Sequence, residues 1–190
     1  MSSNSWNQTL FTLQAAGPTL TAASAASMLV AAAPLAGQNR FTLPANMLKV
    51  GDKLSFSAHG IISNAITTPG TARYDIRFGS TVVFDSGALN LNIVAKTNVP
   101  WYLELELLVR SIGATTAATL WGQGCWQSEA VIASPLPAVG GNGALNIPVS
   151  SLAISTGFDS TVSNTFDCFF TQTLSTGSMT CEIAELIYKT

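Results

Sequence analysis

The side chains that could perform acid–base or metal chemistry are few in this sequence. The single histidine, His59, has no second histidine and no adjacent carboxylate in the sequence, so a zinc site lacks its usual ligands. Residue counts alone do not exclude a Ser-His-Asp triad, but no Gly-x-Ser-x-Gly motif surrounds a serine. We interpret His59 as a structural or surface residue.

Two groups of charged residues alternate along their segments. Glu104 and Glu106 share one face of an expected strand, and paired carboxylates can serve glycoside hydrolysis. The alternative, which we favour, is the solvent- or partner-facing side of a sheet. Arg73, Asp75 and Arg77 form a second alternating set, which predicts a small ion-pair network.

Glycines and tryptophans offer two further kinds of site. Gly122, Gly124 and Gly140-Gly141 are not followed by the lysine and helix of a P-loop. Trp121 and Trp126 could form a sugar-binding platform, but at strand spacing such residues more often pack in a core or an interface. The sequence therefore predicts no catalytic, cofactor-binding or metal-binding residues, and we expect a protein that is not an enzyme.

Composition favours a surface that is covered by partners. Charged residues are 9% of the chain, against about 25% in ordinary soluble domains. Removing water from side chains such as Ser, Thr, Ala and Asn costs little free energy, because they carry no charge. The alternative is a weakly charged secreted β-domain. The net charge of −2 and the lack of a basic run argue against nucleic acid as a partner.

The cysteines and the apolar N-terminal run bear on the cellular compartment. Cys125, Cys168 and Cys181 are an odd number without CxxC spacing, so we expect free thiols in a reduced, cytosolic setting, with a Cys168–Cys181 bridge as the alternative. The run 22–36 has no positive charge before it and is broken by Pro34. We therefore expect neither a signal peptide nor a membrane anchor.

The chain divides by charge into two parts. Residues 1–39 carry no charged side chain, and we expect them to form an arm that orders against a partner, with residues 40–190 as one domain. Within the arm, residues 18–34 are either one short helix or a loosely packed Ala-rich segment over a sheet.

From Phe41 onward the pattern is that of β-strands. Apolar residues alternate with polar ones, most clearly in 101–111, where Leu103, Leu105 and Leu107 would face the core opposite Glu104 and Glu106. We expect strands at 53–64, 72–78, 81–85, 101–111, 115–127, 163–174 and 179–188, and a Pro- and Gly-rich connector at 133–148. Short turns without intervening helices predict an antiparallel, all-β sandwich, and about eight strands in two sheets would make a jelly roll.

Several segments together resemble a jelly-roll module found in virion structural proteins of tailed bacteriophages. They are FTLPANMLKVGDKLSFSAHGIISN, TARYDIRFGSTVVFDSG, WYLELELLVRSIGATTAATLWGQG and the C-terminal FDSTVSNTFDCFFTQTLSTGSMTCEIAELIYKT. The resemblance covers about residues 40–130 and 150–190, and its motifs are turn glycines and alternation rather than reactive groups.

The resemblance implies a protein of the virion surface, made in the host cytoplasm and typically trimeric. Such modules occur in capsid cement (decoration) proteins and in head or tail fibres. We favour a cement protein that binds the major capsid protein, because the chain is short and has no shaft repeat. The alternative is a receptor-binding module for a host glycan, near Trp121–Trp126 or residues 133–148. Our candidate interface residues are Trp6, Phe11, Leu13, Trp121 and Trp126.

Overall fold

The chain folds as two antiparallel β-sheets packed face to face. The structure is a computed structural model that describes residues 6–29, 39–64, 70–131, 143–149, 154–175 and 177–190. Its strands are β1 (Asn7–Thr12), β2 (Ala26–Ser27), β3 (Phe41–Leu43), β4 (Lys53–Asn64), β5 (Thr71–Phe78), β6 (Thr81–Asp85), β7 (Leu89–Asn90), β8 (Lys96–Ser111), β9 (Thr119–Ser128), β10 (Gly143–Ile147), β11 (Asn164–Gln172) and β12 (Ser178–Lys189).

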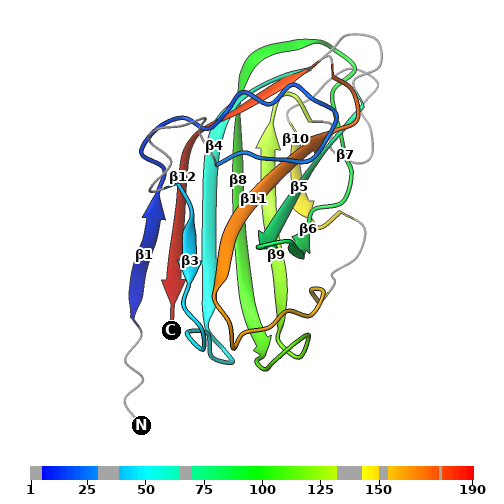
Figure 1. The fold of residues 1–190 in the computed structure, drawn as a ribbon. Coiled ribbons are helices and arrows are strands. Elements are labelled where there is room, and N and C mark those ends of the chain that lie inside the picture. The colour runs from blue at the N-terminus through cyan, green and yellow to red at the C-terminus, as the bar shows by residue number, and fades with distance from the viewer. Residues whose placement is uncertain (1–5, 30–38, 65–69, 132–142, 150–153, 176) are drawn as a thin grey trace.

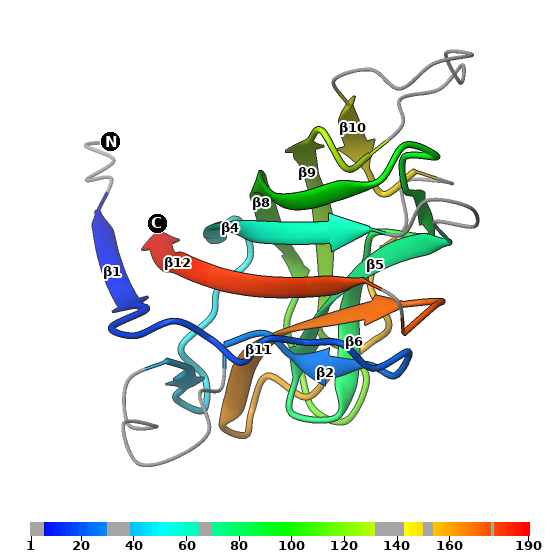
Figure 2. The same ribbon diagram turned by 90° about the horizontal axis from the view of Figure 1, so that it is seen from above.

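The first sheet has the strand order β1-β12-β4-β8-β9-β10 (Figure 1). The second has the order β2-β11-β5-β6, with β3 beside β11 and β7 beside β5. Seen from above, the second sheet lies along one side of the first (Figure 2). The predicted all-β, antiparallel, jelly-roll-like sandwich is confirmed. The described residues form no helix, and thus no helix long and apolar enough to cross a membrane.

Alternation along the long strands builds the core, as the sequence predicted. Leu103, Leu105 and Leu107 of β8 are buried, while Glu104 between them is exposed. Aromatic rings from the two sheets meet in the middle. The Phe56 ring centroid lies 5.2 Å from that of Phe166. This contact joins β4 of the first sheet to β11 of the second.

Residues 6–29 pack on their own chain as part of the sandwich, whereas we expected residues 1–39 to form an arm that orders against a partner. Strand β1 pairs with β12 along the edge of the first sheet. The Phe11 side chain enters the core, 6.2 Å from the Phe166 ring. The amide of Leu13 donates to the Ala184 carbonyl at 2.7 Å. Backbone pairing and apolar burial together hold this segment on its own chain.

The segment then crosses to the second sheet without forming a helix. The Gly17 amide bonds to the Cys181 carbonyl of β12, and the Met28 amide bonds to the Cys168 carbonyl of β11. Met28 and Leu29 are fully buried. The short helix considered for residues 18–34 is thus absent from the described part, 18–29, and its remaining positions lie outside the described residues.

Several strand boundaries differ from the sequence-based expectation. The strand expected at 101–111 begins at Lys96, because residues 96–100 also pair with β4. The strand expected at 115–127 begins only at Thr119, because the chain turns through 112–118 with Thr115 at a positive φ of 58°. Within the expected connector, Gly143–Ile147 pairs with β9 as the edge strand β10. The rest of the connector, apart from Pro148, lies outside the described residues.

Candidate functional site

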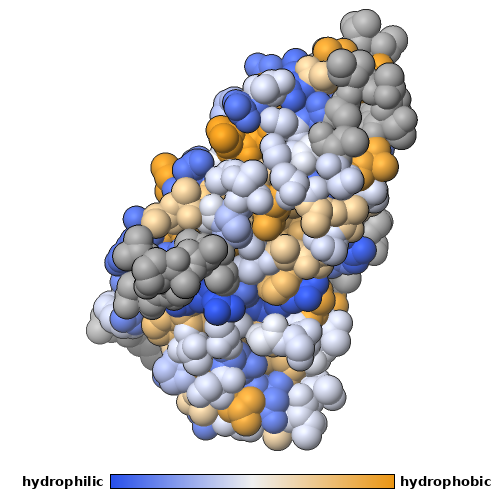
Figure 3. All heavy atoms as spheres, turned by 45° about the horizontal axis from the view of Figure 1, so that its top comes forward, coloured by the Kyte–Doolittle hydropathy of each residue, from blue (hydrophilic) through white to orange (hydrophobic). Residues whose placement is uncertain are grey.

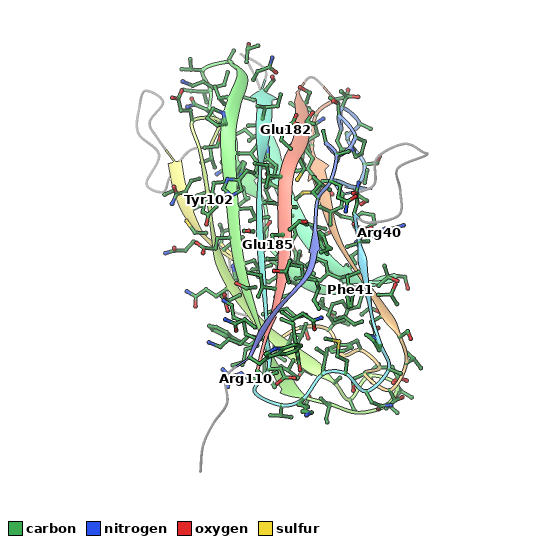
Figure 4. The ribbon with its side chains drawn as sticks, turned by 90° about the vertical axis from the view of Figure 1, so that its left-hand side faces the viewer. Arg40, Phe41, Tyr102, Arg110, Glu182 and Glu185 are labelled. Atoms are coloured by element: carbon green, nitrogen blue, oxygen red, sulfur yellow. The ribbon has the colours of Figure 1, made fainter. Side chains whose placement is uncertain are left out.

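The outer face of the first sheet gathers aromatic, carboxylate and amide side chains. Strand register places its outward residues in rows that cross β12, β4, β8 and β9. The rows are Ile183, His59, Tyr102 and Gln127; then Glu185, Ser57, Glu104 and Cys125; then Ile187, Ser55, Glu106 and Gln123; then Lys189, Lys53, Leu108 and Trp121. Figure 4 shows these strands side by side, with Tyr102, Glu185 and Arg110 labelled.

Residues of the first row line a shallow hollow at the end of the face near His59. The hollow measures about 340 Å³, and its lining includes His59, Tyr102, Gln127 and Glu129. The His59 and Tyr102 ring centroids are 4.6 Å apart. The pKa of the Tyr102 hydroxyl is raised, first by partial burial and then by its hydrogen bond to Glu104. The phenol therefore stays neutral at physiological pH and keeps its proton for hydrogen bonding.

A second hollow continues along β8 and β9. It also measures about 340 Å³, and its lining includes Glu104, Glu106, Trp121 and Gln123. A Cβ atom on Gly124 would lie 2.0 Å from the Glu104 carbonyl oxygen, so only glycine lets β8 and β9 approach so closely here. We call the two hollows together the sheet trough.

The carboxylate of Glu106 is fixed within the trough. It accepts a hydrogen bond from the Ser55 hydroxyl and a charge-assisted one from Lys189 Nζ at 2.9 Å. Burial alone would raise the pKa of Glu106, but these two bonds, together with the positive charges of Lys189 and Lys53, lower it. Glu106 is therefore ionised and oriented at neutral pH. Farther along, the Arg110 guanidinium lies 5.8 Å from the Trp121 ring centroid.

A second candidate surface is the lower end of the sandwich in Figure 1, where three loops meet. Val50, Ile112 and Val162 are 62%, 48% and 50% exposed, and each comes from a different loop. We call these three side chains the apolar tip. On the face that Figure 3 shows, which is turned toward the opposite end, apolar surface forms small separate patches among polar ones.

Hydrogen bonds hold the loops of the apolar tip together. The Ser160 hydroxyl oxygen accepts from the Gly113 amide at 2.9 Å, and the Ser160 carbonyl accepts from the Asn46 amide at 2.9 Å. The carboxylate of Asp159 accepts from Thr161 and from the Thr115 amide, and these bonds lower its pKa. The three loops that carry the apolar tip are thus held together by hydrogen bonds between them.

The outer face of the second sheet carries the ion-pair network that the sequence predicted. Asp75 lies 3.5 Å from Arg73 and 3.0 Å from Arg77, and Arg73 also pairs with Asp85. The Arg77 guanidinium lies 3.9 Å from the Phe169 ring centroid. Because each charge has a partner within the chain, we interpret this face as structural.

A related ion pair lies beside this network. Arg40 Nη1 is 3.1 Å from the Asp167 carboxylate, which also accepts from the Ser27 hydroxyl at 2.6 Å. Burial raises the pKa of Asp167, and its bonds to Ser27 and Arg40 only partly oppose this effect. These contacts tie β11 to β2 and to the residue before β3, which lie along the same edge of β11.

The predicted interface residues do not form one surface. Trp6 is 54% exposed beside the C-terminus, where its carbonyl accepts from the Thr190 amide at 3.0 Å. Leu13 is partly buried against the core, and Trp121 is half-buried in the trough. Phe11 and Trp126 are buried in the core, so neither offers a contact surface to a partner. The interface role of Trp6, Leu13 and Trp121 stays a prediction.

The Trp121–Trp126 sugar platform, the alternative that the sequence disfavoured, is not formed, for a geometric reason. The two residues are an odd number of positions apart in one strand, so they point to opposite sides of the sheet. Trp126 packs against Tyr74 in the core, with ring centroids 5.3 Å apart. Tyr102 is the half-buried aromatic residue that shares the outer face with Trp121, and its even spacing from Glu104 and Glu106 predicts that face, although it was not among the candidate interface residues.

The cysteines and the acidic residues add no reactive cluster. Cys168 and Cys181 are free and buried, and burial raises the pKa of both thiols, to about 12 for Cys181. The bridge between them that the sequence left open is not formed. Among the described residues, no three His, Cys, Asp or Glu side chains lie close enough to hold a metal ion.

Comparisons with known proteins yield one weak structural likeness. No family model matches the chain, and no curated protein matches it. Among solved structures, the chain is similar to the CBM2 module of the evolved Dit of Lactobacillus casei BL23 phage J-1. The sequence identity is 10%, 97% of each chain is covered, and the TM-score is 0.36. That protein is a phage module, but a likeness this weak carries no functional argument.

Proposed function

We propose that this chain is a structural protein of a bacteriophage virion, a cement protein that binds the outer surface of the assembled capsid. The proposal rests first on the segments that resemble phage jelly-roll modules. It rests second on the low charge of the chain, 9% of residues, which keeps the desolvation cost of protein contact small.

The observation that carries the proposal is the apolar tip. Val50, Ile112 and Val162 are aliphatic, exposed and held by loops that bond to one another. The nearby carboxylates of Asp52 and Asp159 already accept bonds from their own chain, so neither needs a partner's cation. A rigid surface of this kind loses little entropy when it binds. We assign the capsid contact to this end, with the major capsid protein as the partner.

We further propose a homotrimer as the bound form. A heterologous contact repeated around a three-fold axis closes into a ring and leaves no free interface. In such a ring, three apolar tips point the same way and meet neighbouring capsid subunits together. Linked binding sites raise the overall affinity without any new contact, provided that all can engage at once.

The experiment that tests this function is imaging of phage particles with the protein labelled. A cement protein covers the shell in many copies at regular lattice positions. A fibre or receptor-binding protein is present in few copies, at the tail or at one vertex. Label found only on the tail would contradict the cement function and favour the receptor-binding alternative.

A further inference from the structure

We propose that the sheet trough is a carbohydrate-binding site for a neutral oligosaccharide. This inference goes beyond the cement function and uses a different surface, so either can fail without the other. It differs from the sugar site considered from the sequence, because Trp126 takes no part and Tyr102 with His59 replaces it.

The shape of the trough suits an extended ligand. Its two hollows follow one another along β8, since Tyr102 lines the first and Glu104, two residues on, lines the second. On β9 the lining runs from Gln127 to Trp121, six residues, or about 20 Å at ~3.3 Å per residue. The hollows are shallow and open, so a chain can lie across them without entering an enclosed pocket.

The lining combines the two groups that a sugar ring needs. A pyranose has apolar C–H faces and a rim of hydroxyl groups. Aromatic rings stand at both ends of the trough, the His59–Tyr102 pair and Trp121. Between them, Glu104, Gln123 and Gln127 provide carboxylate and amide groups that can accept or donate to hydroxyls. Binding sites for small ligands typically combine such apolar walls with a few fixed polar groups.

Charge restricts the class of sugar. The trough carries the carboxylates of Glu104 and Glu106, and Glu129 lines its far end. Glu106 forms an ion pair with Lys189 at 2.9 Å, and Glu129 forms one with Lys96 at 3.2 Å. Because these two carboxylates and their lysine partners neutralise one another, the trough has no excess positive charge to bind a sulfate or uronate group, whereas neutral hydroxyls can donate to the carboxylate oxygens. The ligand is therefore a neutral oligosaccharide.

The polar groups are held in place before any ligand arrives. Glu106 is fixed by Ser55 and Lys189 from the two neighbouring strands. Tyr102 rests against the His59 ring and bonds to Glu104. Groups built on paired strands and fixed by neighbours lose little freedom on binding.

The test is a titration of the full chain with neutral oligosaccharides of glucose, galactose and N-acetylhexosamine units, and with a sulfated oligosaccharide for comparison. Binding is followed by nuclear magnetic resonance at the indole N–H of Trp121, assigned from a Trp121→Phe variant. At least one neutral oligosaccharide should shift this signal. Trp121→Ala and Tyr102→Ala should each weaken binding about tenfold, equal to ~1.4 kcal/mol and comparable to one aromatic contact.

Trp6→Ala is the matched control, because Trp6 is exposed but lies at the far edge of the sheet. It should leave binding unchanged. If Trp121→Ala fails to fold, Gln123→Ala with Gln127→Ala removes exposed side chains from the same trough and should also weaken binding. The trough variants should bind phage particles as well as the unaltered protein.

Three outcomes would overturn the assignment. In the first, no neutral oligosaccharide perturbs the Trp121 signal, or only the sulfated one does. In the second, binding survives all substitutions in the trough. In the third, the trough variants lose particle binding, which would make this face a capsid contact rather than a sugar site.

Discussion

The hydroxyl of Tyr188, on the last strand, donates a hydrogen bond to the carboxylate of Asp52, in the turn before β4. The same carboxylate accepts from the Lys49 amide at 2.8 Å. Gly51, between them, has a φ of 97°, a conformation that glycine adopts without strain. One carboxylate thus ties the turn that presents Val50 to the end of the chain.

Replacing Tyr188 by Phe should lower the free energy of unfolding by about 1–3 kcal/mol, because the buried Asp52 carboxylate loses a partner. Tyr102→Phe is the control, since that hydroxyl lies at the surface and its loss should cost within ~0.5 kcal/mol. Denaturant unfolding of the two variants measures both values. Equal losses would show that the Tyr188–Asp52 bond does not hold the turn.

The same contact predicts a loss of stability at alkaline pH. Burial, and then the bond to Asp52, raise the pKa of Tyr188 above its ordinary value, so the folded state favours the neutral phenol. The neutral Tyr188 phenol contributes fully to the free energy of unfolding below pH 10, about the pKa of tyrosine in the unfolded chain. This contribution is lost as the pH rises toward the higher pKa of the folded state. The free energy of unfolding should therefore fall above about pH 10. In Tyr188→Phe this fall should be shallower, and an identical slope would contradict the assignment.

Phe11→Ala tests whether β1 belongs to the sandwich. Removing a buried phenylalanine typically costs about 3–5 kcal/mol, and Phe11 contacts the core beside Phe166. Trp6→Ala, in the same segment but exposed, should cost far less. Thermal unfolding of both variants measures the difference. If Phe11→Ala is as stable as Trp6→Ala, the segment is a loose arm in solution.

Leu105→Ala tests the assignment of the two faces of β8. Truncating this fully buried leucine should lower the free energy of unfolding by about 2–5 kcal/mol. Glu104→Gln, on the neighbouring exposed position, should change stability by within ~0.5 kcal/mol. Similar losses from the two substitutions would contradict this assignment of the faces.

The long central strands could be predicted from the sequence because their alternation is local. Leu103, Leu105 and Leu107 repeat at period two, and no distant residue is needed to identify the buried face. The ion pairs of Asp75 with Arg73 and Arg77 follow from the same spacing.

The edge strands could not be predicted in this way, because their partners are distant in the chain. Thr9 of β1 pairs with Ile187 of β12, and nothing near Thr9 in the sequence indicates that pairing. Strand β10 lies among Gly and Pro residues, whose composition favours a loop. The apolar tip was missed for a similar reason, since its three residues come to the same end of the sandwich only when three loops converge.

The most direct test of the cement function is the temperature at which phage particles release their DNA. Particles lacking the protein receive either the unaltered protein or a variant with Val50, Ile112 and Val162 changed to Glu. Their DNA release temperatures are then compared at low and at high salt. An Ile154→Glu variant, altered at an exposed position outside the tip, is the control.

The unaltered protein and the control should raise the release temperature, and the tip variant should not. A partner that binds only the assembled lattice stabilises it by about 2.7 kcal/mol per site at a hundredfold excess over the dissociation constant. The effect should change little with salt, because apolar contacts are not screened. Bare particles that release DNA at the same temperature, but no longer adsorb to cells, would contradict the cement function.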